Sequence, residues 1–124
     1  MTTYPAAASI AIATMPLEPW PIDPASILAG QPTAAGSVVS RSKDGCVLRG
    51  LWDCTPGRFR WEWTYDETLV VLYGRARVQV DGGPLVEIGP GDFAWFERGQ
   101  KATWETIEHL RKAFHALSPT PLPF

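Results

Sequence analysis

An alternation of aromatic and charged residues shortly after Cys54 constrains the fold more than any other part of the chain. Four aromatic residues occupy every second position, with charged residues between them: Phe59, Trp61, Trp63 and Tyr65 alternate with Arg58, Arg60 and Glu62. Because successive side chains of a β-strand point to opposite faces, this pattern predicts a strand with an aromatic face and a charged face. The aromatic face then meets an acid, Glu67.

Further strands are expected along most of the chain. They are predicted over residues 36–42, 46–53, a segment that ends at Gly74, 75–80, 84–88 and 93–96. Asp44-Gly45 is a strong hairpin signal. The closing segment, residues 101–117, is predicted as two strands with a kink, although residues 105–117 also fit an amphipathic helix. Turn signals about every eight to twelve residues predict a single all-β barrel.

The spacing around Glu67 resembles the first motif of the cupin superfamily. In that motif a glycine precedes a histidine, any residue, a second histidine, a glutamate, six residues and a final glycine. Aligned on Glu67 and Gly74, the two histidine positions fall on Trp61 and Trp63. The first motif is therefore present in its spacing and altered in its ligands.

A second resemblance lies further along the chain. Residues 88–99 are similar to the second cupin motif, whose opening turn matches Pro90-Gly91-Asp92 and whose final histidine position falls on Ala102. Over Gly50 to Leu117 the chain is similar to the small single-domain cupins related to ureidoglycine aminohydrolase and the ethanolamine-utilisation cupins, the DUF861 or Cupin_3 group. This resemblance implies a jelly-roll barrel, also called a double-stranded β-helix.

The metal ligands that this resemblance implies are mostly absent. Where metal-binding cupins carry three histidines and a glutamate, only Glu67 is kept. The two histidines, His109 and His115, lie roughly 20 Å apart along a straight strand, too far to share one ion. Because a first-row metal normally needs three or four protein ligands, we expect no metal and no cofactor. Dioxygenase chemistry and the manganese-dependent aminohydrolase activity of related cupins are then not expected.

The first 35 residues differ in composition from the rest, being rich in proline and alanine and almost uncharged. Because proline fixes φ and removes a backbone donor, we expect a partly extended or disordered N-terminal arm over residues 1–35, followed by the barrel over residues 36–124. Asp23, Pro24 and Gly30 are typical of the cap, start and stop of one helical turn. The resemblance implies an arm that packs across a partner subunit; a disordered tail before Pro16 is the alternative.

Charge and cysteine content argue against several classes of function. The formal net charge of −2 offers no broad attraction to nucleic acid. The apolar N-terminal run lacks a preceding basic region and is interrupted by Pro5, so we expect neither a secretory signal nor a membrane span. Cys46 and Cys54 are too few for a disulfide scaffold. We expect reduced thiols in the cytoplasm, the alternative being a bridge in an oxidising compartment.

Glu67 is the strongest candidate for chemistry. A carboxylate among aromatic side chains needs a neighbouring cation or a raised pKa. The resemblance places Arg111 and Lys112 on the last strand, but the sequence leaves open which of them points inward. Paired with Lys112, Glu67 could transfer a proton as a general acid or base. The alternative is a structural ion pair at the barrel mouth.

The aromatic residues offer a binding surface. Trp61, Trp63 and Trp104, together with Tyr73 and Trp95, are predicted to form a slot for a ring or an acyl chain. The alternative is that these side chains fill a small barrel. Arg111 completes the set of predicted ligand-binding residues.

Three classes of function remain. We favour a metal-free cupin that binds a small polar or aromatic metabolite between the tryptophans, fixed by Glu67 with Lys112 or Arg111. The second class is a metal-independent isomerase, lyase or aminohydrolase-like enzyme in which Glu67 is the general acid or base. The third is a structural or protein-interaction subunit, whose barrel would be filled to its mouth.

The segment after Glu67 is apolar, or nearly so, on both faces: Leu69 and Val71 follow Glu67 on one face, and Thr68, Val70 and Leu72 lie on the other. A barrel wall of this kind needs a cover on its outer side. The arm, a second layer or a partner subunit can provide one. We expect a homodimer, because two-fold dimers are the commonest solution.

Overall fold

The computed structural model describes residues 6–124, and strands account for nearly all of its regular structure. In chain order the elements are β1 (Glu18–Pro19), the 3-10 turn η1 (Pro24–Ser26), β2 (Ile27–Gly30), β3 (Ala34–Arg41), β4 (Val47–Cys54), β5 (Gly57–Glu62), β6 (Asp66–Val80), β7 (Leu85–Ile88), β8 (Phe93–Phe96) and β9 (Lys101–Leu117). Among these residues no helix approaches the length and apolar character needed to cross a bilayer.

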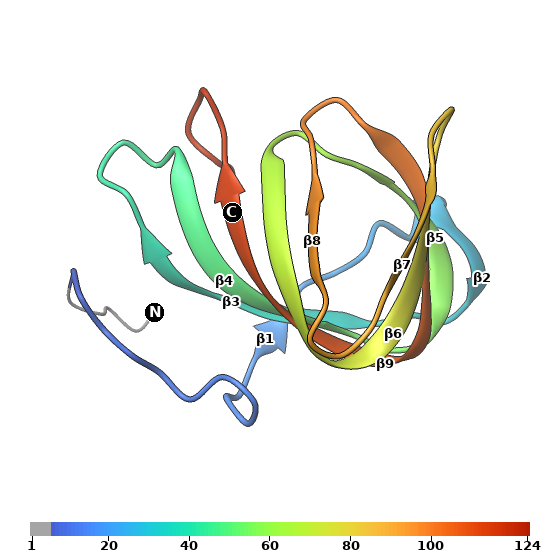
Figure 1. Cartoon of the computed structure of the whole chain (residues 1–124), viewed down its shortest axis with the longest axis horizontal. Coiled ribbons are helices and arrows are strands. Elements are labelled where there is room, and N and C mark those ends of the chain that lie inside the picture. Colours follow the sequence, from blue (N-terminus) through green and yellow to red (C-terminus); the bar gives the residue numbers. More distant parts are fainter. Residues whose placement is uncertain (1–5) are drawn as a thin grey trace.

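Two long strands, β6 and β9, form the spine of a strongly curled sheet (Figure 1). They pair antiparallel along almost their whole length. On the other edge of β9, β4 pairs with the C-terminal half and β5 with the N-terminal half. On the other edge of β6, β8 pairs with the N-terminal half and β7 with the C-terminal half. The two halves of the spine therefore belong to two sheets that curl around a common interior, which confirms the predicted barrel.

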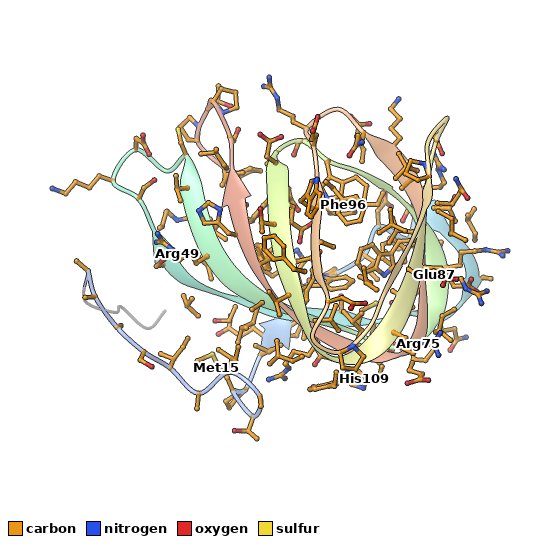
Figure 2. The ribbon with its side chains drawn as sticks, viewed as in Figure 1. Met15, Arg49, Arg75, Glu87, Phe96 and His109 are labelled. Carbon is orange, nitrogen blue, oxygen red and sulfur yellow. The ribbon has the colours of Figure 1, made fainter. Side chains whose placement is uncertain are left out.

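The interior holds the apolar side chains of every long strand. Leu69, Val71, Val78 and Leu110 are almost completely buried. Phe96 lies among the side chains that fill the barrel, whereas Arg75 and His109 project from its outer surface (Figure 2). Burial of this apolar set is the main source of stability, at roughly 25 cal/mol for each Å² removed from water.

β6 does not end at Gly74, contrary to the prediction. Its pairing with β9 changes register three times between Val71 and Ala76, and Gly74 has a φ of +82°. A Cβ at Gly74 would lie 2.0 Å from the carbonyl oxygen of His109, so only glycine fits this bulge. The buried, inward residues are odd-numbered before the bulge and even-numbered after it: Glu67, Leu69 and Val71, then Ala76, Val78 and Val80.

β9 is one continuous strand, neither two strands nor a helix. Its even-numbered residues are buried along almost its whole length: Ala102, Trp104, Thr106, Leu110, Lys112, Phe114 and Ala116. β9 pairs with three strands, so its backbone groups have hydrogen-bond partners in the sheet at nearly every position. These bonds favour a strand although the spacing of its apolar residues also fits a helix. β5 is shorter than predicted and ends at Glu62, where the backbone of Trp63 bonds to the turn at residues 99–100.

The N-terminal arm passes around an edge of the sheet. β1 pairs with β3 and β2 with β5, so the arm contributes short strands at two places. The carboxylate of Asp23 accepts a hydrogen bond from the backbone N–H of Ala25 at 3.0 Å and caps η1. The predicted helical turn is thus present, but it ends at Ser26 and a strand follows it up to Gly30. Residues 1–5 of the predicted arm lie outside the described residues.

Candidate functional site

A cavity of about 370 Å³ opens into the barrel, and we call it the barrel cavity. Its walls are mostly aromatic and come from β4, β5, β9 and the turn before β6: Trp52, Phe59, Trp61, Tyr65, Trp104 and Phe114. The arm contributes residues 20–23 and Ser26 to the wall. The two charged residues of the barrel interior, Glu67 and Lys112, also line it.

Glu67 and Lys112 form a buried ion pair. Lys112 Nζ donates to Glu67 Oε2 at 2.6 Å, and the indole Nε1 of Trp63 donates to Glu67 Oε1 at 2.9 Å. The side chain of Glu67 is 2% exposed and that of Lys112 is 8% exposed. Trp63 in turn stacks on Phe96, with ring centroids 4.3 Å apart. Both oxygens of the carboxylate are therefore held in place by groups that are themselves packed.

The ammonium of Lys112 lies among aromatic rings. Its Nζ is 4.7 Å from the ring centroid of Trp52, 5.0 Å from that of Trp104 and 5.6 Å from that of Phe114. Trp52 is the cross-strand neighbour of Lys112 in the β4–β9 ladder, so the backbone register fixes this contact. Ring faces attract a cation and partly replace the water that it loses on burial.

Tyr65 and Cys54 show how far the interior is removed from water. Burial, together with the nearby charge of Glu67, raises the pKa of Tyr65 well above its ordinary range. Burial also raises the pKa of the Cys54 thiol to about 11. Both groups are therefore neutral at physiological pH, and the charge of the interior is carried by the ion pair.

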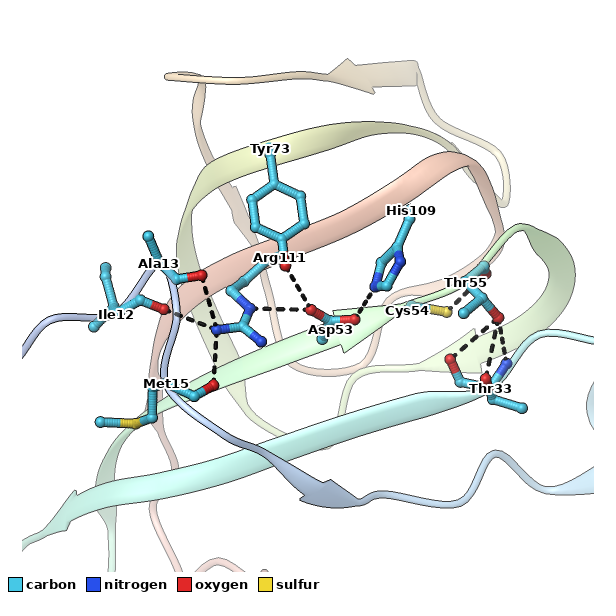
Figure 3. Close-up of polar contacts among 10 residues, drawn as sticks. All are labelled: Ile12, Ala13, Met15, Thr33, Asp53, Cys54, Thr55, Tyr73, His109 and Arg111. Atoms are coloured by element: carbon cyan, nitrogen blue, oxygen red, sulfur yellow. Dashed lines mark hydrogen bonds and ion pairs between the residues drawn. The ribbon is translucent and has the colours of Figure 1, made fainter.

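A second polar cluster lies on the outer side of the sheet, and we call it the outer cluster: Asp53, Tyr73, His109 and Arg111 (Figure 3). Asp53 accepts from Arg111 Nε at 3.0 Å, from the Tyr73 hydroxyl at 3.0 Å and bonds to His109 Nε2. Burial alone would raise the pKa of Asp53, but these hydrogen bonds outweigh it and hold the pKa below its ordinary value. Asp53 is therefore a carboxylate at neutral pH.

Arg111 ties the outer cluster to the N-terminal arm. Its Nη1 donates to the backbone carbonyls of Ile12, Ala13 and Met15 at 2.9, 3.2 and 2.9 Å (Figure 3). The arm continues past this anchor into the wall of the barrel cavity at residues 20–23. One side of the sheet thus holds the segment that helps to enclose a cavity on the other side.

Comparison with sequence families decides the classification. The family model described as the EutQ-like cupin domain matches residues 41–114, which is more than half of the chain. The chain belongs to the EutQ-like cupins.

Solved structures agree with this cupin classification. A putative ethanolamine utilization protein Q of Salmonella typhimurium is similar at 22% identity and a TM-score of 0.61, over 68% of this chain and 69% of that one. The EutQ protein of Clostridium difficile has 17% identity and a TM-score of 0.70, over 89% and 86%. A DUF861 family protein of Pseudomonas syringae pv. tomato has 20% identity and a TM-score of 0.75, over 83% and 45%. No curated protein matches the chain.

The residues at the cupin metal positions do not fit a metal ion. Trp61, Trp63 and Ala102 offer no ligand lone pair, and both oxygens of Glu67 already accept hydrogen bonds. Trp61 faces Ala102 across the β5–β9 ladder, so two of these positions are neighbours that hold no donor atom. Among residues 6–124 no group of three His, Cys, Asp or Glu side chains could hold a metal elsewhere. One carboxylate is too small a donor set.

The cupin brings together four of the residues predicted for its site. Glu67, Lys112, Trp61 and Trp104 all line the barrel cavity, and Lys112 rather than Arg111 is the inward cation. Trp63 lies behind Glu67, where it positions the carboxylate and is 1% exposed. It supports the cavity without forming its wall.

Tyr73 and Arg111 are placed differently from the prediction. Both belong to the outer cluster, so neither reaches the barrel cavity. Arg111 points outward because it is odd-numbered on β9, and Tyr73 faces it across the β6–β9 ladder within the bulge. Trp95 also lies outside, with 64% of its surface exposed.

Sequence reasoning missed Trp20, Trp52 and Phe114 as cavity residues. For Phe114 a signal existed, since Leu110, Phe114 and Ala116 share the even-numbered positions near the end of β9, a parity that would also have placed Lys112 inside. Trp20 could not be found in this way, because it approaches the cavity from an irregular arm. It packs edge-on against Phe114, with ring centroids 6.5 Å apart.

Proposed function

We propose that this EutQ-like cupin binds a small polar or aromatic metabolite in the barrel cavity, without a metal. The observation that carries the proposal is that the buried Glu67–Lys112 pair lines a cavity inside the barrel, with Lys112 the more exposed of the two residues. Its volume, about 370 Å³, is at the lower end of the range for small-molecule sites. A purely structural barrel would be filled by its own residues.

The roles of the two charged residues follow from their contacts. Glu67 bonds through both oxygens to protein donors, so it serves to hold Lys112. An ammonium has three N–H donors, and one of those of Lys112 is used by Glu67. Lys112 is therefore the group that a ligand would meet, with Trp61 and Trp104 as surfaces for a flat ring.

The test is ligand-dependent stabilisation. A panel of small aromatic and polar metabolites should raise the thermal unfolding temperature, because a ligand at about 100 times its Kd adds about 2.7 kcal/mol of stability. Lys112→Met should abolish this shift for ligands that accept a hydrogen bond from Lys112. Lys101→Met is the matched control, since Lys101 is an exposed lysine of the same strand and pairs with Glu62 on the surface at 3.9 Å. Equal shifts in both variants would place the ligand outside the barrel cavity.

A metal-independent enzyme is the second candidate function. It is favoured by the short contact, 2.6 Å, across which Glu67 and Lys112 can exchange a proton beside a bound ligand. Glu67→Gln separates the two candidates once a ligand is known. A binding protein should keep ligand-dependent stabilisation in this variant, whereas an enzyme should keep binding and lose turnover.

We also propose that the cupin forms a homodimer. Three apolar residues lie together on β6 and β8 and define a surface patch: Val70, Phe93 and Trp95, which are 41%, 63% and 64% exposed. Val70 faces Phe93 in the β6–β8 ladder, and the rings of Phe93 and Trp95 have centroids 5.9 Å apart. Within the described residues the arm leaves this face open, so a second subunit is the cover we favour.

For the location of the protein we propose the cytoplasm. The support is that Cys46 and Cys54 are both free thiols, as expected in a reducing compartment. Localisation of a fluorescent fusion expressed in its native host would test this.

A further inference from the structure

We infer that the ligand of the barrel cavity is an uncharged, flat molecule that carries a carbonyl-type hydrogen-bond acceptor. This inference rests on the proposed function and specifies its ligand class. It follows from the distribution of charge around the barrel cavity and from the donors that remain there.

The barrel cavity is electrically balanced before any ligand enters. Glu67 and Lys112 are its buried charged residues among residues 6–124, and they neutralise each other. Arg60 lies at the margin of the barrel cavity and is paired with Asp81: its Nη1 donates to Asp81 Oδ1 at 2.9 Å. Asp23 is exposed and caps η1. A charged ligand would therefore bring a buried charge that no protein group compensates.

Such a charge is costly in this setting. The walls are aromatic, and the ionisable wall residue Tyr65 has a raised pKa, so it cannot supply a counter-charge. A carboxylate near Lys112 would also lie close to Glu67, and an ammonium near Glu67 would lie close to Lys112. Burying an unpaired charge costs far more than burying a hydrogen-bonded neutral group.

The remaining hydrogen-bonding capacity specifies the polar end of the ligand. Lys112 is a donor only, and its Nζ lies 4.7–5.6 Å from the ring centroids of Trp52, Trp104 and Phe114. Glu67 already accepts from Trp63 and Lys112. A ligand that contacts Lys112 must therefore present an acceptor to it, and a carbonyl oxygen provides one without charge. The flat walls favour a ring as the body of the molecule.

Two sets of three probes of nearly equal size test this inference. The first is nicotinamide, nicotinate and 3-(aminomethyl)pyridine; the second is indole-3-acetamide, indole-3-acetate and tryptamine. Each set compares a neutral amide, an anion and a cation on one ring. Titration calorimetry of the whole chain at neutral pH should show that the amide of a set binds at least about tenfold more tightly than its acid or amine.

Variants that remove one of the two buried charges should change which probe of a set binds most tightly. Glu67→Gln leaves Lys112 unbalanced, so the acid should become the tightest ligand of its set. Lys112→Met leaves Glu67 unbalanced, so the amine should gain. The double variant Glu67→Gln with Lys112→Met has no net charge in the barrel cavity. It should therefore not bind the acid more tightly than the amide, as Glu67→Gln alone should. Glu62→Gln, an exposed acid of the surface pair with Lys101, is the matched control and should change nothing.

The outcomes separate the inference from the function on which it rests. If an acid or amine binds the unaltered protein more tightly than its amide, and Lys112→Met weakens that binding, the ligand class is wrong and the proposed site stands. If none of the six probes binds, both are overturned. If Glu67→Gln does not fold, as circular dichroism will show, the comparison of the three probes on the unaltered protein still decides.

Discussion

Arg111 and Lys112 are neighbours in sequence, and their side chains point to opposite faces of β9. Lys112 bonds to Glu67 inside the barrel, and Arg111 bonds to Asp53 and to the arm outside it. Both pairs are buried, and removing one partner would leave a buried charge without compensation. For this reason Lys112→Met should lower the free energy of unfolding by about 3–5 kcal/mol relative to the unaltered protein.

The pKa of Asp53 leads to a prediction about acid stability. Its folded-state pKa lies below its ordinary value of 3.8, so ionised Asp53 stabilises the folded state. This contribution is fully present above about pH 4 to 5 and is lost as pH falls through the folded-state pKa. Asp53→Asn should cost about 1–3 kcal/mol at neutral pH.

Urea unfolding at several pH values measures this effect. The difference in unfolding free energy between the unaltered protein and Asp53→Asn should shrink as pH falls below about 4. A difference that stays constant down to pH 3 would mean that the contacts of Asp53 with Arg111, His109 and Tyr73 do not stabilise its ionised form.

At the scale of elements, the bulge in β6 decides which residues share the interior. Before the bulge Glu67 points inward, and after it the inward parity changes, so that Val78 and Val80 also point inward. Without this change, one half of the long strand would turn its apolar residues to solvent. The bulge therefore allows one strand to serve both sheets.

Gly74→Ala should consequently be strongly destabilising, by more than about 2 kcal/mol. An alanine at position 74 would need a positive φ, and its Cβ would lie 2.0 Å from the carbonyl oxygen of His109. Because the clashing atom belongs to the backbone, no side-chain movement can relieve the contact. Gly82→Ala is the matched control: its φ is +67°, but a Cβ would meet nothing within 4 Å. It should cost only about 1–2 kcal/mol, from backbone strain alone.

Thermal and urea unfolding of the two glycine variants provide the comparison. Equal losses of stability in both would show that the contact at Gly74 is relieved by movement of β9.

For the whole molecule, the two faces of the curled sheet carry different candidate sites. The inner face encloses the barrel cavity, and the outer face carries both the outer cluster and the surface patch of Val70, Phe93 and Trp95. Because the arm is anchored on the outer face and contributes Trp20 to the cavity wall, the two faces are mechanically linked. Assembly and ligand binding can then use different surfaces of one small barrel.

The double variant Phe93→Ser with Trp95→Ser should weaken dimerisation by at least about tenfold, because exposed aromatic residues dominate the energetics of such interfaces. Sedimentation at micromolar concentration measures the change. Leu85→Ser is the control, since Leu85 is 51% exposed on β7 outside the patch and should leave assembly unchanged. Unaltered protein that sediments only as a monomer would contradict the homodimer.

Local patterns in the sequence determined the class of fold and the central acid. The alternation around Trp61 and Trp63 follows from the two-residue period of a strand, and the turn at Asp23 follows from its capping chemistry. Glu67 shares its parity with the apolar Leu69 and Val71 on one strand, and this parity fits its place inside the barrel. These are properties of neighbouring residues, which a linear chain displays directly.

Only the tertiary structure decided which distant groups meet. Lys112 reaches Glu67 because β9 pairs with β6, and Tyr73 is turned outward by a bulge that requires the backbone of His109 beside Gly74. Trp20 joins the cavity because β1, directly before it, pairs with β3, and because its own N–H donates to the carbonyl of Ala34 at 2.9 Å. The chemistry of the site depends on these long-range pairings, since charge balance and cavity shape arise only when separate strands pack together.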